Sequence, residues 1–181
     1  MLFSVLLIKK RREAGMAKPN AFVKISGSLS KKKKEVIEWL KNISKQYFLV
    51  ICPGGGEQIN EAFKARGFKV KFGPLGRITD SLEEKQLARN VLEKNRAMIQ
   101  DLVDEAGINA RVIIPVDEIA TVLCHVNGDV KLLAAYNGFD KLFILTEKDR
   151  VKKKKLWVKK VAKVFEVIEK GGLDKIEVVG F

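Results

Sequence analysis

Short apolar runs alternate along this chain with stretches whose apolar residues recur every three or four positions. The runs carry hydrophobic side chains at consecutive positions, which is typical of strands buried on both faces. The spaced patterns are typical of amphipathic helices. The alternation predicts an α/β fold, a three-layer αβα sandwich with a mostly parallel central sheet. We expect strands near residues 22–26, 47–53, 112–115, 120–126, 141–146 and 176–179, and helices near 32–45, 57–65, 82–105, 130–136 and 157–168.

The longest predicted helix has the clearest start. Ser81 and Glu84 form a capping-box pattern directly before residues 82–105. The apolar stripe of this helix is long for one side of a small domain. Core packing explains most of it, and a homodimer interface along part of the helix is the second interpretation.

The chain of 181 residues is long enough for one domain with a sizeable core. We expect an extension over residues 1–20 and a single domain over 21–181, with lobes at about 21–115 and 116–181. Met1 to Ile8 are largely apolar and a basic run follows them, the reverse of a secretory signal. Eight residues are also too few to span a bilayer. We expect a cytoplasmic protein with no membrane partner. Two interpretations of the first fifteen residues stay open: an extension ahead of a native start at Met16, or a segment that forms an added strand or a weak membrane-surface contact.

The net charge of +13 is local. Residues 1–20 hold five basic groups and one acid, and residues 148–160 hold eight basic groups and one acid. A nucleic-acid interface usually spreads basic groups along a docking face, so we expect no nucleic-acid partner. The run Lys152 to Lys155 is interpreted as a solvated face or as a phosphate site. Cys52 and Cys124 lie in apolar runs without metal-ligand spacing, which favours free thiols and no metal site.

Two glycine turns carry the candidate chemistry. The first follows a strand that contains Lys24 and ends at Gly27, and the second is Gly54-Gly55-Gly56 ahead of a helix. Glycine lets backbone N–H groups approach an anion closely, and a helix N-terminus adds a favourable dipole. Because ligands of parallel sheets bind beyond the carboxyl ends of the strands, both turns predict a site for a small anionic substrate.

The order of the motifs resembles the amino acid kinase family over nearly the whole chain from Asn20. The motifs are Val23-Lys24-Ile25-Ser26-Gly27-Ser28, the stretch from Gly54 to Asn60, Gly76-Arg77-Ile78-Thr79-Asp80, and Asn127-Gly128-Asp129. Within that family the local match is nearest to acetylglutamate kinases and their aminoadipate relatives, enzymes of amino-acid biosynthesis. The resemblance implies ATP with Mg²⁺ as cofactor and phosphoryl transfer to an N-acetylglutamate-like carboxylate, giving an acyl phosphate.

The resemblance also implies a role for each site residue. Lys24 would stabilise charge on the transferring group, and Asp129 would organise the lysines. Phosphate or ATP would contact Gly27, Ser28, Thr146 and Lys152. The acceptor would contact Gly54, Gly55, Gly56, Arg77, His125 and Asn127, with the Arg77 guanidinium on a carboxylate.

Departures from the family pattern leave two alternatives open. Ser26 replaces a glycine, Pro53 stands where acetylglutamate kinases usually have histidine, and Arg150 replaces another glycine near the expected adenine pocket. The first alternative is a phosphomonoester kinase of the uridylate, isopentenyl phosphate or aminomethylfuran phosphate type. The second is a non-catalytic ligand-binding or regulatory protein. An enzyme is the favoured expectation.

Overall fold

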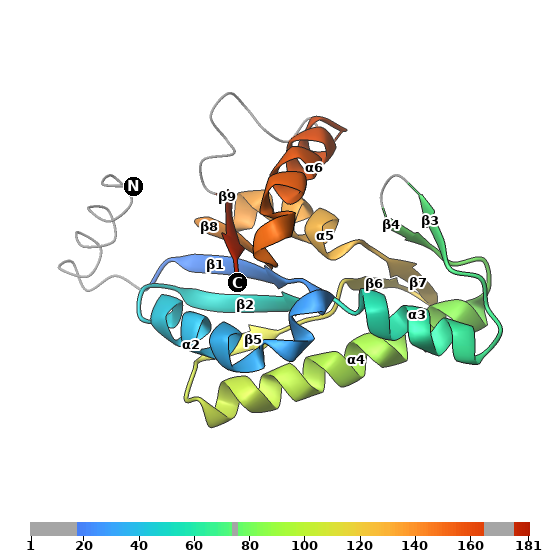
Figure 1. Cartoon of the computed structure of the whole chain (residues 1–181), viewed down its shortest axis with the longest axis horizontal. Coiled ribbons are helices and arrows are strands. Elements are labelled where there is room, and N and C mark those ends of the chain that lie inside the picture. The colour runs from blue at the N-terminus through green and yellow to red at the C-terminus, as the bar shows by residue number, and fades with distance from the viewer. Residues whose placement is uncertain (1–17, 74–75, 165–175) are drawn as a thin grey trace.

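A five-stranded sheet forms the centre of the molecule (Figure 1). The structure is a computed structural model, and it describes residues 18–73, 76–164 and 176–181. The strand order is β5-β2-β1-β8-β9, and every pairing is parallel. The strands are β1 (Asn20–Ile25), β2 (Phe48–Pro53), β5 (Ala110–Val112), β8 (Lys141–Thr146) and β9 (Ile176–Gly180). The sheet therefore takes strands from both predicted lobes.

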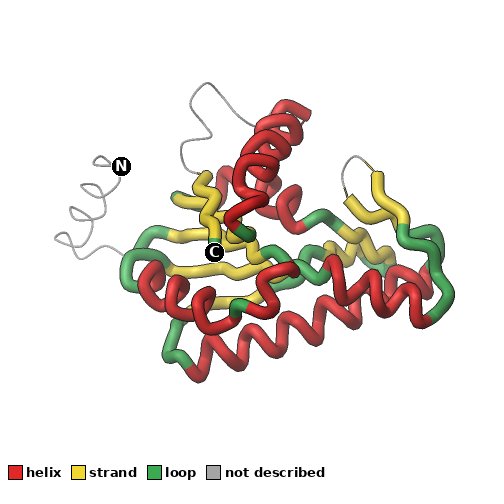
Figure 2. Tube along the Cα trace, in the orientation of Figure 1, coloured by secondary structure: helices red, strands yellow, loops and turns green. Residues whose placement is uncertain are grey.

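Helices cover both faces of this sheet, which confirms the three-layer prediction (Figure 2). One face packs on α2 (Lys33–Ser44) and α4 (Leu82–Glu105), and the other on α5 (Gly128–Ala134) and α6 (Val151–Val164). The alternation of strand side chains assigns each residue of β1 to one layer. Val23 packs on the α2 and α4 side, whereas Phe22 packs on the α5 and α6 side. Lys24 shares the second side, so its ammonium lies among the residues of α5 and α6.

The region beyond the sheet differs most from the sequence-based expectation. Helix α3 (Gly56–Ala65) packs on α4 there, through a cluster that includes Phe63 and Leu92. The predicted loop at 73–80 is a hairpin of β3 (Lys71–Gly73) and β4 (Gly76–Ile78). The predicted strand at 120–126 is also part of a hairpin, formed by β6 (Val116–Ile119) and β7 (Val122–His125). Strands of three or four residues are too short for a clear alternation of apolar and polar side chains.

The helix boundaries follow local signals. Ser81 Oγ accepts a hydrogen bond from the Glu84 N–H, and the Glu84 carboxylate accepts one from the Ser81 N–H, so the predicted capping box is confirmed. Helix α6 begins at Val151, earlier than expected, because the lysine run is itself a good helix former. Short 3₁₀ turns complete the chain at η1 (Gly27–Lys31), η2 (Tyr136–Gly138) and η3 (Lys148–Arg150).

Three predictions concern the ends of the chain, its relation to a membrane and its assembly. The first fifteen residues and the end of the predicted C-terminal helix at Gly171-Gly172 lie outside the described residues. Within the described part, no helix combines the length and apolar character that a membrane crossing needs. The homodimer through residues 82–105 stays a prediction.

Candidate functional site

A polar pocket lies where β1 and β2 end, between the glycine turns and the N-terminus of α5. Its volume is about 370 Å³. Ten of the twelve predicted site residues line it: Lys24, Gly27, Ser28, Gly54, Gly55, Gly56, Arg77, His125, Asn127 and Asp129. The carboxyl end of a parallel sheet therefore gathers residues that are more than one hundred positions apart, as such sheets commonly do.

Asp129 forms the centre of the charged cluster in this pocket. Its side chain is 2% exposed, and it lies in the first turn of α5, where Asn127 caps the helix by accepting a hydrogen bond from the Asp129 N–H. Lys24 Nζ lies 3.0 Å from Asp129 Oδ1, and Lys154 Nζ lies 2.5 Å from Asp129 Oδ2. Lys24 also donates to Ser26 Oγ at 3.2 Å. One carboxylate thus holds two ammonium groups, so the cluster has an excess of positive charge.

Burial and charge act in opposite directions on these groups. Burial raises the pKa of Asp129, but the ammonium groups of Lys24 and Lys154 outweigh it and hold the pKa below its ordinary value. Burial lowers the pKa of Lys154, and Asp129 only partly offsets this. Cys52 is paired with Lys24 in the register of β2, and burial raises the pKa of its thiol to about 12. The Cys52 thiol is therefore neutral and takes no part in the charge balance.

The two glycine turns contact each other through their backbones. The Gly54 N–H donates to the Ile25 carbonyl at 2.7 Å. A Cβ atom on Gly54 would lie 3.1 Å from the Gly27 nitrogen, and one on Gly27 would lie 3.2 Å from the Gly56 nitrogen, so a side chain at either position would force the two backbones apart. Asn95 Nδ2 of α4 donates to the Gly54 carbonyl at 3.3 Å and helps to fix this turn. The close contact of the two turns thus accounts for both glycines, whatever the pocket binds.

Arg77 of β4 reaches the pocket from the opposite rim. Its guanidinium lies between the rings of Phe63 and Phe72, at 5.2 and 4.9 Å from their centroids. Nη2 donates to Asn60 Oδ1 at 2.6 Å and to the Gly56 carbonyl at 3.1 Å. Nη1 is buried without a hydrogen-bond partner, and no carboxylate of the described residues lies within 4 Å of the guanidinium. Burial lowers the pKa of Arg77, but the group stays charged near neutral pH.

His125 and Asn127 form the wall between Arg77 and Asp129. His125 Nε2 donates to the Lys85 carbonyl of α4 at 2.8 Å. Burial, together with the nearby charges of Lys85 and Arg77, lowers the pKa of this ring, and the hydrogen bond to Lys85 only partly offsets the shift. Gly76 has a φ of +128°, and a Cβ there would lie 2.9 Å from Asn127 Cβ. The β3–β4 hairpin therefore needs a glycine at this point to pack on the wall.

Two predicted residues lie elsewhere. Thr146 is fully buried at the end of β8 and does not line the pocket. Lys152 is exposed on α6 and lines a separate groove between α6 and β9. The lysine that does enter the pocket is Lys154, because it lies on the same face of α6 as the buried Val158 and Val161. Helical spacing within the lysine run could have identified it.

Asn60 is a second residue whose role the sequence analysis missed. It accepts a hydrogen bond from Arg77 and also lines the pocket. No local pattern connects these positions, since the contact arises when the β3–β4 hairpin folds over α3. Among the described residues, no cluster of three or more His, Cys, Asp or Glu side chains could hold a metal ion.

Comparison with solved structures shows the fold of the chain. N-acetylglutamate synthase from Neisseria gonorrhoeae, complexed with coenzyme A and N-acetyl-glutamate, matches 90% of this chain with a TM-score of 0.56 and 12% sequence identity. The same enzyme complexed with coenzyme A and L-arginine also matches 90%, with a TM-score of 0.52 and 10% identity. The chain spans about half the length of these neighbours, 54% and 56%. A scan of protein-family models and a search of curated proteins found no match.

These findings correct the expected membership in the amino acid kinase family. The matched structures are named as an N-acetylglutamate synthase that was crystallised with coenzyme A. Phosphoryl transfer from ATP with Mg²⁺, whether to a carboxylate or to a phosphomonoester, is therefore unsupported, and the kinase prediction is wrong. The physical reason lies in the turns: close backbone contact accounts for Gly27 and Gly54, so their pattern reflects how this fold joins β1 and β2 and does not specify a reaction.

Proposed function

We propose that the polar pocket binds a small carboxylate-bearing anion, and that its class is an N-acylated acidic amino acid, for which N-acetyl-L-glutamate is the first probe. The observation that carries the proposal is the shared carboxylate of Asp129. Lys24 and Lys154 both lie within 3.0 Å of it, and in the described part of the chain neither has a second carboxylate within 4 Å, so two positive charges share one negative charge. An anion that enters the pocket supplies a second negative charge.

Arg77 provides a second group that can bind a carboxylate of the ligand. Arg77 is half-buried and its Nη1 is fully buried without a partner, which is costly because this part of the charged group has lost water without gaining a counterion. The planar group is suited to a forked contact with a carboxylate. The side chains that line the pocket include four basic and two acidic residues, an excess that attracts an anion. These residues are Lys24, Arg77, Arg150 and Lys154, with Glu57 and Asp129.

The size of the pocket limits what it can hold. A volume of about 370 Å³ lies at the lower end of the range for small-molecule sites, roughly 300–1,000 Å³. An acylated amino acid is compatible with this volume. Coenzyme A, with a nucleotide and a long arm, does not fit as a whole, and we derive no acetyl-transfer step for this chain. The expectation of an enzyme remains a prediction, to which the names of the matched synthases lend support.

Calorimetric titration with N-acetyl-L-glutamate tests the proposal. We expect saturable binding in the wild type and at least ~10-fold weaker binding in Arg77→Met, since a hydrogen bond to a charged group contributes about 1.5–3 kcal/mol. Arg66→Met is the matched control, because Arg66 is exposed and its ion pair is with the exposed Glu83. N-acetyl-L-glutamate diamide, which has no carboxylate, should not bind. Absence of binding to the folded wild type, or equal binding by Arg77→Met, contradicts the proposal.

A further inference from the structure

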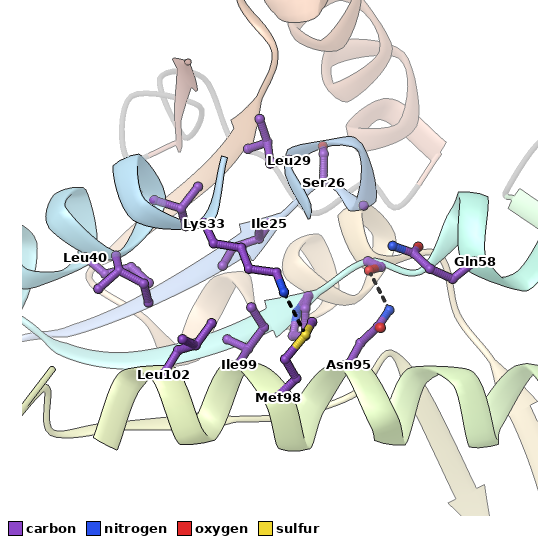
Figure 3. A pocket seen from close by; sticks show the side chains of 15 residues that line it. Ile25, Ser26, Leu29, Lys33, Leu40, Gln58, Asn95, Met98, Ile99 and Leu102 are labelled. Atoms are coloured by element: carbon purple, nitrogen blue, oxygen red, sulfur yellow. Dashed lines mark hydrogen bonds between the residues drawn. The ribbon is translucent and has the colours of Figure 1, made fainter. Parts of the chain in front are cut away.

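A second cavity lies behind the glycine turns, on the α2 and α4 side of the sheet (Figure 3). Its walls are aliphatic, and they come from the end of β1, from η1 and α2, and from the middle of α4. We call this cavity the apolar slot, and its aliphatic lining consists of Ile25, Leu29, Val36, Ile37, Leu40, Ile99 and Leu102. Ile37, Ile99 and Leu102 are only half-buried, so the slot opens to solvent between the two helices.

Besides Ser26, whose hydroxyl accepts from Lys24, three polar side chains interrupt the aliphatic lining. Lys33 Nζ extends over the slot and donates to Met98 Sδ at 3.0 Å (Figure 3). A thioether is a weak acceptor, and among the described residues no carboxylate lies within 4 Å of this ammonium. Gln58 Oε1 is buried without a hydrogen-bond partner. Asn95 uses its Nδ2 on the Gly54 carbonyl and keeps its Oδ1 for another donor.

The slot therefore presents a cation that lacks an anion, two amide oxygens that can accept, and an aliphatic recess. We propose that it is a second ligand site, which binds an aliphatic α-amino acid such as leucine or valine. The carboxylate of the amino acid replaces Met98 as the partner of Lys33. The ammonium of the bound amino acid donates to Gln58 Oε1 and Asn95 Oδ1, and the side chain of the bound amino acid enters the recess between α2 and α4.

The volume of the slot selects the side chain. It measures about 40 Å³, which is room for about three water-sized spheres at roughly 10–15 Å³ each. A cavity that accepts a benzene ring is several times larger, about 150 Å³. The recess thus holds about three methyl-sized groups, such as the terminal isopropyl group of leucine or valine, whereas the six carbons of an aromatic ring do not fit; the α-carbon with its two charged groups stays at the mouth of the slot. A guanidinium would lose its hydration on this lining without finding a partner, so the slot also discriminates against arginine.

Titration of the full chain with amino acids and their fragments tests the proposed class. L-leucine and L-valine should bind and raise the thermal midpoint. 4-Methylpentanoate, which lacks the ammonium, and 3-methylbutylamine, which lacks the carboxylate, should each bind ~10-fold more weakly or worse, because each loses a charge-assisted hydrogen bond. L-phenylalanine and L-arginine should not bind at the slot. Equal binding of leucine and 4-methylpentanoate would overturn the assignment to amino acids.

Variants of the lining locate the binding site. Lys33→Met should weaken leucine binding ~10-fold or more, whereas Lys34→Met, its exposed neighbour on α2, should leave it unchanged. Gln58→Met, which keeps the shape of the side chain, should weaken leucine binding severalfold. Leucine binding that is unchanged in Lys33→Met refutes the proposal.

A second copy of the chain is the competing occupant of the slot, because the predicted homodimer would use α4. Light scattering over a range of concentrations separates the two. We expect the oligomeric state of the wild type to be the same with and without leucine, and Leu102→Phe to abolish leucine binding without changing that state. A dimer that dissociates in Leu102→Phe, with no leucine binding in the wild type, overturns the proposal.

Discussion

The polar pocket and the apolar slot are built on the same wall, yet they differ in how their charges are balanced. Ser26, Gly27 and Gly54 line both cavities. On the pocket side, Lys24 is buried and paired with Asp129. On the slot side, Lys33 is partly exposed and donates to the sulfur of Met98, with no carboxylate of the described residues within 4 Å. Consecutive residues of β1 face opposite layers, so Ile25 lines the slot while Lys24 lines the pocket.

The two lysines differ in whether their ammonium group needs a counterion in the folded protein. A buried ammonium requires a counterion in the protein, so its pair becomes part of the folding free energy. A half-exposed ammonium keeps much of its hydration and needs no counterion for folding. We therefore expect changes in the pocket to alter stability strongly, and changes at the mouth of the slot to alter ligand binding without altering stability.

Replacing Asp129 should have the largest effect on stability. Asp129→Asn leaves two ammonium groups buried side by side without a counterion, which should lower the free energy of unfolding by about 3–5 kcal/mol. Urea denaturation at pH 7 measures this. Asp117→Asn is the matched control, because Asp117 pairs with Lys131 at a side-chain exposure of 44%, where loss of a pair costs about 1 kcal/mol or less. Equal losses of unfolding free energy in the two variants would contradict the role of Asp129 as the buried counterion of two lysines.

The two lysines on the shared wall give a direct comparison. Lys24→Met removes one of the two cations held by Asp129, and because Lys154 remains we expect a loss of only about 1–2 kcal/mol. Lys33→Met replaces a contact with a thioether and should change the free energy of unfolding by less than about 0.5 kcal/mol. Both values come from the same urea experiment. A larger loss of unfolding free energy for Lys33→Met than for Lys24→Met would contradict the view that the charge in the pocket supports folding whereas the charge at the slot does not.

Acid should remove the stabilisation that Asp129 provides. Since the folded-state pKa of this carboxyl lies below its ordinary value of 3.8, its contribution is complete above that value and is lost as the pH falls through the folded-state pKa. The stability difference between wild type and Asp129→Asn should be constant above about pH 5 and shrink below pH 3.8, by at most about 1.4 kcal/mol per pH unit. Unfolding measured at pH 6, 4 and 3 tests this. A difference that grows on acidification has the wrong sign for a paired carboxylate.

The fold was more predictable from sequence than the site, and particular residues show why. A run such as residues 141–146 is apolar because both faces of the strand are covered, and this requirement is visible in the run itself. The capping box at Ser81 and Glu84 is equally local. The β3–β4 hairpin depends instead on distant partners, with Arg77 between two phenylalanine rings and Gly76 against Asn127. Such contacts between distant residues leave no regular spacing of apolar and polar residues in the sequence.

The candidate site was predicted as a set of positions but not as a reaction. Glycine turns at the ends of two parallel strands must lie close together, so Gly27 and Gly54 could be placed near Lys24 before the structure was known. The choice of a kinase went further than those residues allow, because the close contact of the two turns accounts for both glycines. The lysine in the pocket could have been identified as Lys154 from its spacing to Val158 and Val161.

The smallest expected effect is a coupling between the two cavities, and it rests on both proposed ligands. Because Ser26, Gly27 and Gly54 line both cavities, leucine in the slot should change the affinity of the pocket for N-acetyl-L-glutamate, by about fivefold or less. The factor must be the same when the order of titration is reversed, since coupling free energies are reciprocal. Lys33→Met, in which leucine binding should be ~10-fold weaker or worse, serves as the control. At a leucine concentration that saturates only the wild type, this variant should show little change in N-acetyl-L-glutamate affinity. A coupling of the same size in this variant would mean that leucine binds in the polar pocket itself, which would contradict a coupling between two separate cavities.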